Sequence, residues 1–262
     1  MAKEGIILLP TPENWANVRV VEPLPTQRWC QELGLYLRTD PPDAEFRYMM
    51  SKWNQDGFWN QRPSELKKLD HVYQIWPHYE TVGNHIHSVI QNLNTSLPIN
   101  GVDYLHQTDR DRNGMIRALR AATLLHDVSK TDPFNANHPY DSAEISYREY
   151  LRWMGLSKEE KELAVLLIRH HDTIGMAINR NEASTTIDHI VSLFTTPAIL
   201  QCAYALTVAD ISSIKGLREN NPAILEEVRA ASSIALKRIL AKKNGEIRPF
   251  YSINFSRPSL SR

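Results

Sequence analysis

The stretch 115–127, MIRALRAATLLHD, decides the fold, because it predicts an apolar helix that ends in a histidine and an aspartate. Leu124 and Leu125 would anchor the backbone in a core, so that His126 and Asp127 can both point into one cavity. A single His-Asp pair occurs by chance in a chain with ten histidines, and the pair alone is a weak signal. The residues that accompany it carry the argument.

Further histidines and carboxylates occur on both sides of this pair, in an order that places them on successive helices. His85 and His87 precede it, Lys130 follows closely, and later come His138, His170, His171 and Asp210. His170 and His171 end the apolar run 163–169, and Asp210 ends the run 203–209. A charge at such a position is costly unless it is paired or binds metal. Imidazole nitrogens and carboxylate oxygens suit one or two divalent ions, among Mn, Ni, Co, Mg, Zn or Fe.

The rest of the pattern predicts an all-α protein. No alternating strand pattern occurs, and Ser157 with Glu160 forms a capping box at the start of one helix. Apolar periodicity and stop signals predict the helices at 79–97, 114–126, 141–154, 157–171, 184–194, 198–216 and 222–243.

Prolines are concentrated in residues 1–43, which predicts an irregular arm without long helices, packed over the core. These prolines are Pro10, Pro12, Pro23, Pro25, Pro41 and Pro42. We therefore expect three parts: the N-terminal arm 1–60, a helical domain 61–245 and a basic C-terminal tail 246–262.

Composition excludes several classes of partner. Thirty basic and thirty acidic side chains cancel, so no overall charge attracts nucleic acid or membranes. The local group Arg110, Arg112, Arg117 and Arg120 could form a basic patch, which is weak support for nucleic acid. Two cysteines suit a reducing compartment, and no apolar run approaches the roughly 18 residues of a membrane span. We expect a cytoplasmic protein.

Over about residues 75–215 the chain resembles the HD superfamily of metal-dependent phosphohydrolases. The stretch 124–130, LLHDVSK, is similar to the His-Asp-x-x-Lys element of the family. The segment 138–172 is similar to the HD region of bacterial CCA-adding tRNA nucleotidyltransferases. Residues 1–74 are too short for the nucleotidyltransferase domain of those enzymes and lack its motif. The resemblance implies an HD-type helical bundle with a hydrolytic function.

The resemblance also implies the ligands of two ions. The first would be held by His85, His126, Asp127 and Asp210, with His87 as the alternative to His85. The second would be held by His138 and by His171 or His170, with Asp127 bridging. Bound ions would lower the pKa of a water and polarise a phosphoryl oxygen. Lys130 would stabilise the developing charge, or else would be a cation at a helix end.

The expected function is that of a metal-dependent phosphohydrolase, either a phosphomonoesterase or a phosphodiesterase. Its expected substrate is a small, nucleotide-like phosphate ester. One alternative is a di-iron oxygenase, because the myo-inositol oxygenase group has similar sites; another is a non-catalytic HD sensor module. Four histidines match no motif position and are expected to be structural: His71, His78, His106 and His189.

Overall fold

The computed structural model describes residues 25–38, 43, 46–48, 62–75, 77–105, 112–132, 134–178 and 183–243. Within these ranges the chain forms helices and no β-strand; two isolated β-bridges join Tyr73 to Thr81 and Ile99 to Val102. The prediction of an all-α fold is confirmed.

The helices differ widely in length, and several short turns extend them. Their bounds are α1 Pro25–Arg38, α3 Ser64–Lys68, α4 Val82–Asn92, α5 Arg112–Leu125, α6 His138–Ile145, α7 Lys158–Arg169, α8 Thr173–Ile178, α9 Ala183–Leu193, α10 Pro197–Ser213, α11 Lys215–Asn220 and α12 Ile224–Lys243. A 3₁₀ turn, Leu69–His71, extends α3, and a π-helical segment, Ser146–Tyr150, followed by a 3₁₀ turn, Leu151–Trp153, extends α6.

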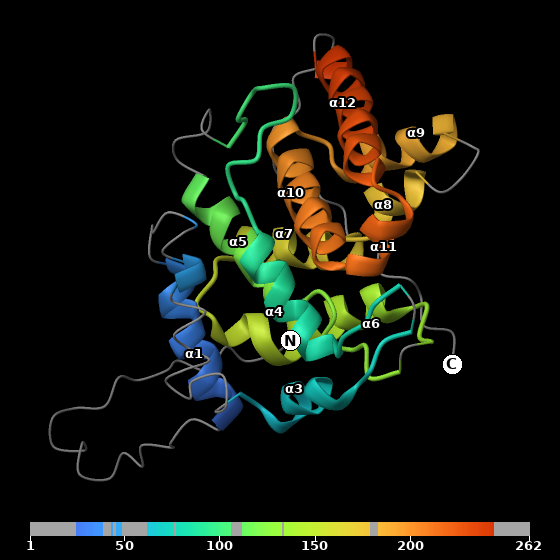
Figure 1. Cartoon of the computed structure of the whole chain (residues 1–262). Coiled ribbons are helices and arrows are strands. Elements are labelled where there is room, and N and C mark those ends of the chain that lie inside the picture. Colours follow the sequence, from blue (N-terminus) through green and yellow to red (C-terminus); the bar gives the residue numbers. More distant parts are fainter. Residues whose placement is uncertain are drawn as a thin grey trace, which may run out of the picture.

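Helix α10 lies at the centre of the bundle (Figure 1). It packs against α4 on one side and α12 on the other, while α5 packs against α7 and α7 against α6. Most of its side chains are buried, as expected for a helix that is apolar on every face. Among the described helices none is by itself long and apolar enough to cross a membrane, although the bent pair α9 and α10 meets the length and composition together.

Polar caps fix where the helices that carry the candidate site begin. The capping box of Ser157 and Glu160 is present at the start of α7, as predicted. The Thr81 side chain accepts a hydrogen bond from the Asn84 amide at the start of α4, and Thr196 caps α10 in the same way. These contacts fix the residues at which α4 and α10 begin.

Several predicted helices differ in their bounds from the observed ones. The predicted helix 79–97 ends at Leu93, which has an extended backbone, so the later proline is not its stop signal. The predicted helix 198–216 breaks at Ile214, also extended, into α10 and α11. The predicted helix 141–154 is present but changes from α to π to 3₁₀ geometry along its length.

The prediction of an arm without long helices is wrong for residues 25–38, which form the 14-residue helix α1. Pro25 occupies the first position of α1, where the missing amide hydrogen is not needed. Helix α1 packs against α5 through apolar side chains, the buried ones being Trp29, Cys30, Leu33 and Leu37. The remainder of the predicted arm lies largely, and the basic tail 246–262 entirely, outside the described residues.

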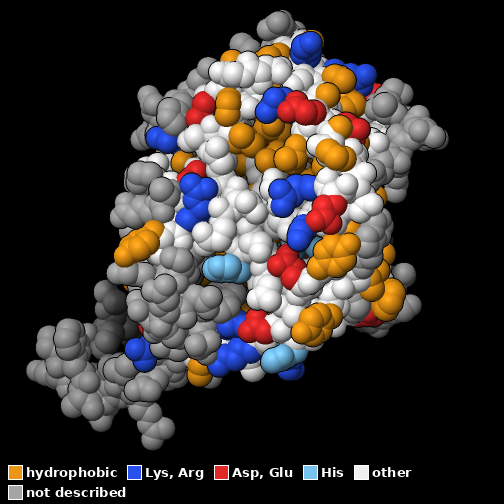
Figure 2. Space-filling view, in the orientation of Figure 1, with side chains coloured by type: hydrophobic (Ala, Val, Ile, Leu, Met, Phe, Trp, Pro, Cys, Tyr) orange, Lys and Arg blue, Asp and Glu red, His pale blue; other side chains and the backbone are white. Residues whose placement is uncertain are grey.

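Two of the four arginines of the expected basic patch pair with acidic side chains. Arg117 forms an ion pair with Glu160, and Arg120 is buried beside Asp43 with 3.4 Å between Nη2 and Oδ1. Arg110 lies outside the described residues. On the face seen in Figure 2, basic and acidic side chains are interspersed, in keeping with the zero net charge. Among the described side chains of this face, Figure 2 shows no large patch of a single sign.

The contact of α1 with the rest of the bundle can be tested with two glycines. A Cβ on Gly34 would overlap the backbone carbonyl oxygen of Met154, whereas a Cβ on Gly175 would meet only Ile211 Cδ1, at 3.5 Å. We expect Gly34→Ala to lower the free energy of unfolding by about 1–3 kcal/mol through overpacking. Gly175→Ala should raise it by about 0.5–1 kcal/mol, because alanine favours helix. Urea denaturation measures both; a Gly34→Ala protein as stable as the parent would mean that α1 does not pack closely.

Candidate metal centre

Asp127 lies between two pairs of histidines. Its Oδ2 atom is 3.8 Å from Nε2 of His85 and 3.8 Å from Nε2 of His126. Its Oδ1 atom is 3.2 Å from Nε2 of His138 and 3.7 Å from Nε2 of His171. Two groups of buried or half-buried side chains that could hold a metal ion therefore share this one carboxylate.

The backbone orients three of the four imidazoles in the same way. Nδ1 of His126, His138 and His171 each lies 2.8–2.9 Å from the carbonyl oxygen three residues earlier, which belongs to Thr123, Asn135 and Ile168 respectively. In the neutral ring this contact places the hydrogen on Nδ1 and leaves the lone pair on Nε2. Nε2 is the atom that faces Asp127 in each case, and such a backbone contact is typical of metal-binding histidines.

The central donors fit a cation. His126 Nε2 is buried and has no hydrogen-bond partner within the described part of the chain. Burial lowers the pKa of His126 to about 4, so at neutral pH its lone pair faces the carboxylate of Asp127. Two electron-rich atoms in this position repel each other unless a positive charge lies between them. The set of nitrogen and oxygen donors matches what a divalent ion requires, so the buried groups could hold one.

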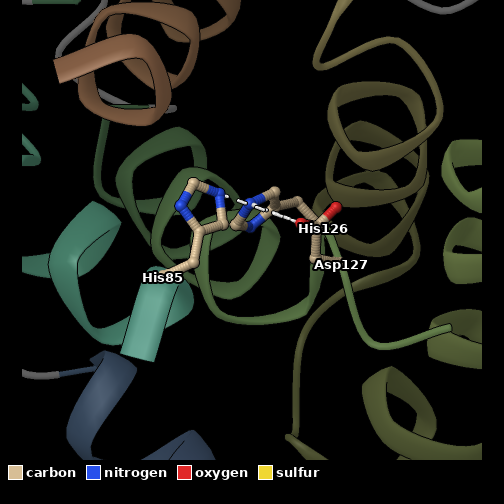
Figure 3. Close-up of side chains that lie close together, drawn as sticks. All are labelled: His85, His126 and Asp127. Carbon is tan, nitrogen blue, oxygen red and sulfur yellow. Dashed lines mark ion pairs between the residues drawn. The ribbon is translucent and has the colours of Figure 1, made fainter. Parts of the chain in front are cut away.

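His85 comes from the first turns of α4 and connects the cluster to α10. Its Nε2 atom is 3.0 Å from Oδ1 of Asp210, and its Nδ1 atom is 2.9 Å from Oγ of Ser213. Ser213 in turn donates to the Asp210 carbonyl oxygen, and Glu80 Oε1 lies 3.6 Å from His85 Nδ1. Figure 3 shows His85 facing His126 and Asp127 across the gap between α4 and the end of α5.

The acidic partners determine the charge of these groups. Burial disfavours the charged form of His85, but hydrogen bonds to Asp210 and Glu80 outweigh burial and raise its pKa to about 9. Burial disfavours the charged form of Asp127 too, yet Lys130 and His126 hold the pKa of its carboxyl well below the usual range. The pKa of Asp210 is lowered in the same way by His85. Both carboxylates are therefore ionised at neutral pH.

Lys130 belongs to the cluster rather than to a helix end. Its Nζ atom is 3.1 Å from Oδ2 of Asp127, and its side chain is mostly buried. Helix α5 ends at Leu125, so Lys130 lies beyond the last turn, where the helix dipole has fallen off. Lys130 is thus an ion-pair partner of the carboxylate that the two groups of possible ligands share.

The sequence left two choices open, His85 or His87 and His170 or His171. In each case one histidine belongs to the groups of possible metal ligands. His171 is part of it, whereas the His170 ring lies 6.2 Å from the ring of Tyr140 and 6.4 Å from that of His189. His85 is part of it, whereas His87 belongs to neither group of possible ligands among the described residues.

Two residues that were not among the expected site residues lie beside His85. His78, expected to be structural, has its ring centroid 4.8 Å from that of His85 and nearly perpendicular to it. Glu80 lies beside His85 Nδ1. Both precede Thr81, the cap of α4, by only a few residues. Their closeness in sequence to the helix that carries His85 is the feature that could have indicated them. Burial, with the nearby charges of His85 and Lys130, lowers the pKa of His78 to about 4.

Comparison with known proteins gives two similar relatives, each named a bifunctional uridylyltransferase/uridylyl-removing enzyme. The one from Idiomarina loihiensis is 28% identical over 245 residues, which cover 89% of this chain and 27% of the relative. The one from Azospirillum brasilense is 30% identical over 154 residues, which cover 58% of this chain and 16% of the relative. No protein-family profile matches the chain. The chain thus spans about a quarter or less of either relative, and both are enzymes named for reactions of a nucleotidyl group.

The choice between His85 and His87 is testable by metal affinity. We expect His85→Ala to lower the affinity of the purified protein for Mn²⁺ or Co²⁺ by more than about tenfold, because its Nε2 faces both Asp127 and Asp210. His87→Ala should bind metal like the parent. Calorimetric titration of both variants measures this, and the opposite ranking would move the ligand position by two residues.

Asp127 should be the least replaceable residue of the centre. Asp127→Ala removes the only carboxylate shared by both groups of possible ligands, so we expect it to bind no stoichiometric metal. Its far-UV circular dichroism should remain helical, because the helices are fixed by the apolar core. Elemental analysis after dialysis gives the metal content; full stoichiometry in this variant would refute the shared position of Asp127.

Proposed function

We propose that this protein is a metal-dependent phosphohydrolase of the HD type that hydrolyses a phosphate ester of a nucleotidyl group. The observation that carries the proposal is the carboxylate of Asp127, each oxygen of which faces one pair of imidazoles. The names of the two relatives support a nucleotidyl substrate, since uridylyl removal releases such a group.

In this proposal His85, His126, Asp127 and Asp210 hold one divalent ion, and His138, His171 and Asp127 hold a second. His170, the alternative to His171, is left out because its ring lies toward Tyr140. When bound, such ions supply a Lewis acid for the phosphoryl oxygens and a more acidic water.

The chain's own residues prepare the site for hydrolysis. Ser213 accepts from His85 Nδ1, so that His85 presents Nε2 to the centre, and the backbone does the same for the other three imidazoles. The Lys130 ammonium group lies at the centre and can contact a phosphoryl oxygen as negative charge develops there. Overall, water attacks phosphorus, the bond from phosphorus to the leaving oxygen breaks, and that oxygen takes up a proton.

A metal-dependent release assay tests the proposal. The purified chain is stripped of metal, loaded separately with Mn²⁺, Co²⁺, Ni²⁺ or Mg²⁺, and given p-nitrophenyl esters of UMP and AMP, cyclic nucleotides and sugar phosphates. We expect release from a nucleotidyl ester that requires metal and is lost in Asp127→Ala. Oxygen consumption by a protein that binds paired iron and cleaves no phosphate ester would favour the oxygenase alternative and contradict the proposal.

The role of Lys130 is separable from a role in stability. We expect Lys130→Met to lower kcat on the nucleotidyl ester by a factor of ~10²–10³, the range for loss of one transition-state donor. Metal content and melting temperature should hardly change. A helix-end cation would instead cost about 0.3–1 kcal/mol of stability and leave kcat intact. Lys158→Met, at an exposed lysine that opens α7, is the matched control.

A further inference from the structure

The segment 72–81 joins the 3₁₀ turn after α3 to α4 as a loop whose ends are hydrogen-bonded; residues 72–75 and 77–81 of this loop are described, and His78 is among them. Its two ends are joined by the hydrogen bond from the Val82 amide to the Val72 carbonyl oxygen, at 2.9 Å, and by one from Gln74 to Glu80, at 3.3 Å. Within the loop, the His78 amide donates to the carbonyl oxygen of Ile75. These bonds hold the His78 backbone in a defined place beside the first turn of α4.

Helix α11 packs closely against this loop at Gly216. A Cβ on Gly216 would lie 2.5 Å from the Pro77 carbonyl oxygen and 2.9 Å from a ring carbon of Tyr79. Only a residue without a side chain permits this approach, so α11 lies directly against the residues on either side of His78. Because α11 follows the helix that carries Asp210, the loop is fixed to the same part of the molecule as the candidate metal centre.

His78 reaches the centre without belonging to either group of possible metal ligands. Its ring stands edge-on to that of His85, with 4.8 Å between the centroids and 89° between the planes. It is close enough for the charges of Asp127, Lys130 and Asp210 to affect its pKa. The four central histidines have Nδ1 bound by a backbone carbonyl or by Ser213. His78 Nδ1, by contrast, is buried without a hydrogen-bond partner among the described residues.

If the His78 imidazole only packed against His85, its buried Nδ1 atom would make no hydrogen bond that offsets the loss of its contact with water. Burying a polar atom without a partner is unfavourable, so such an atom at the edge of a site suggests a partner that arrives with the ligand. A phosphoryl group has several acceptor oxygens, and Lys130, already paired with Asp127, can contact only part of them.

We propose that His78 is a catalytic residue of this centre, which donates a hydrogen bond to a phosphoryl oxygen of the substrate beside Lys130. This inference rests on the proposed phosphohydrolase function. It adds a substrate contact from the loop 72–81 to the ligands that come from α4 to α10.

The test uses the full chain loaded with metal and two probes, inorganic phosphate and the p-nitrophenyl ester of UMP. His78→Phe keeps a ring against His85 and removes both nitrogens, and His78→Gln keeps an N–H donor. His71→Ala, at an exposed histidine in the 3₁₀ turn just before the loop, is the control. Calorimetry measures metal and phosphate binding, and release of p-nitrophenol measures kcat and KM.

We expect His78→Phe to bind metal like the parent but inorganic phosphate roughly 10- to 100-fold more weakly, the effect of losing one hydrogen bond to a charged group. The value of kcat/KM should fall by a similar factor, His78→Gln should recover part of both, and His71→Ala should change neither.

Other outcomes overturn the inference in distinguishable ways. Parent-like phosphate affinity and kcat/KM in His78→Phe would show that the ring only packs against His85. Loss of metal in the same variant would make His78 a ligand instead. If the metal-loaded parent neither binds phosphate nor cleaves the ester, the proposed function fails and the inference fails with it.

Discussion

The arrangement of the candidate metal centre depends on one buried carboxylate. Asp127 is almost fully buried, and a carboxylate in such a place must be compensated by positive charge. Lys130 contributes one charge at 3.1 Å, and the four imidazoles that face Asp127 come from α4, from the end of α5, from the start of α6 and from the end of α7. The four imidazoles therefore surround this one charge, while the apolar core fixes the helices that carry them.

The neighbours of each imidazole also explain why His85 and His126 differ in protonation. His85 is held charged by Asp210 and Glu80, whereas burial keeps His126 neutral with its Nε2 lone pair directed inward. A protonated imidazole, that of His85, and a neutral imidazole with a free lone pair, that of His126, therefore both lie 3.8 Å from Asp127 Oδ2. Metal ligands must be deprotonated, so a cation held by His85 would take the place of the proton on its imidazole. Ser213 and Glu80 both lie beside Nδ1 of this ring.

The sequence predicted the parts of the site that local pattern controls. Asp127 ends an apolar helix whose phase can be read from residues 115–125, and the capping box at Ser157 is likewise local. The choice of His171 over His170 could not be read in this way, because α7 ends at Arg169 and the chain turns at His170, with φ at −125°. His78 was missed for a different reason: its place depends on the closure of a loop and on contact with α11, far along the chain.

Burial also shows from which side a substrate would approach. His85, His126 and Asp127 are inaccessible, with side chains at most 1% exposed, while those of Lys130, Asp210 and His138 are 14–16% exposed. The accessible edge of the cluster therefore joins an ammonium group, a carboxylate and an imidazole, and the inaccessible residues form its floor. A ligand that enters at this edge would meet Lys130, Asp210 and His138 before it met the inaccessible residues beneath them.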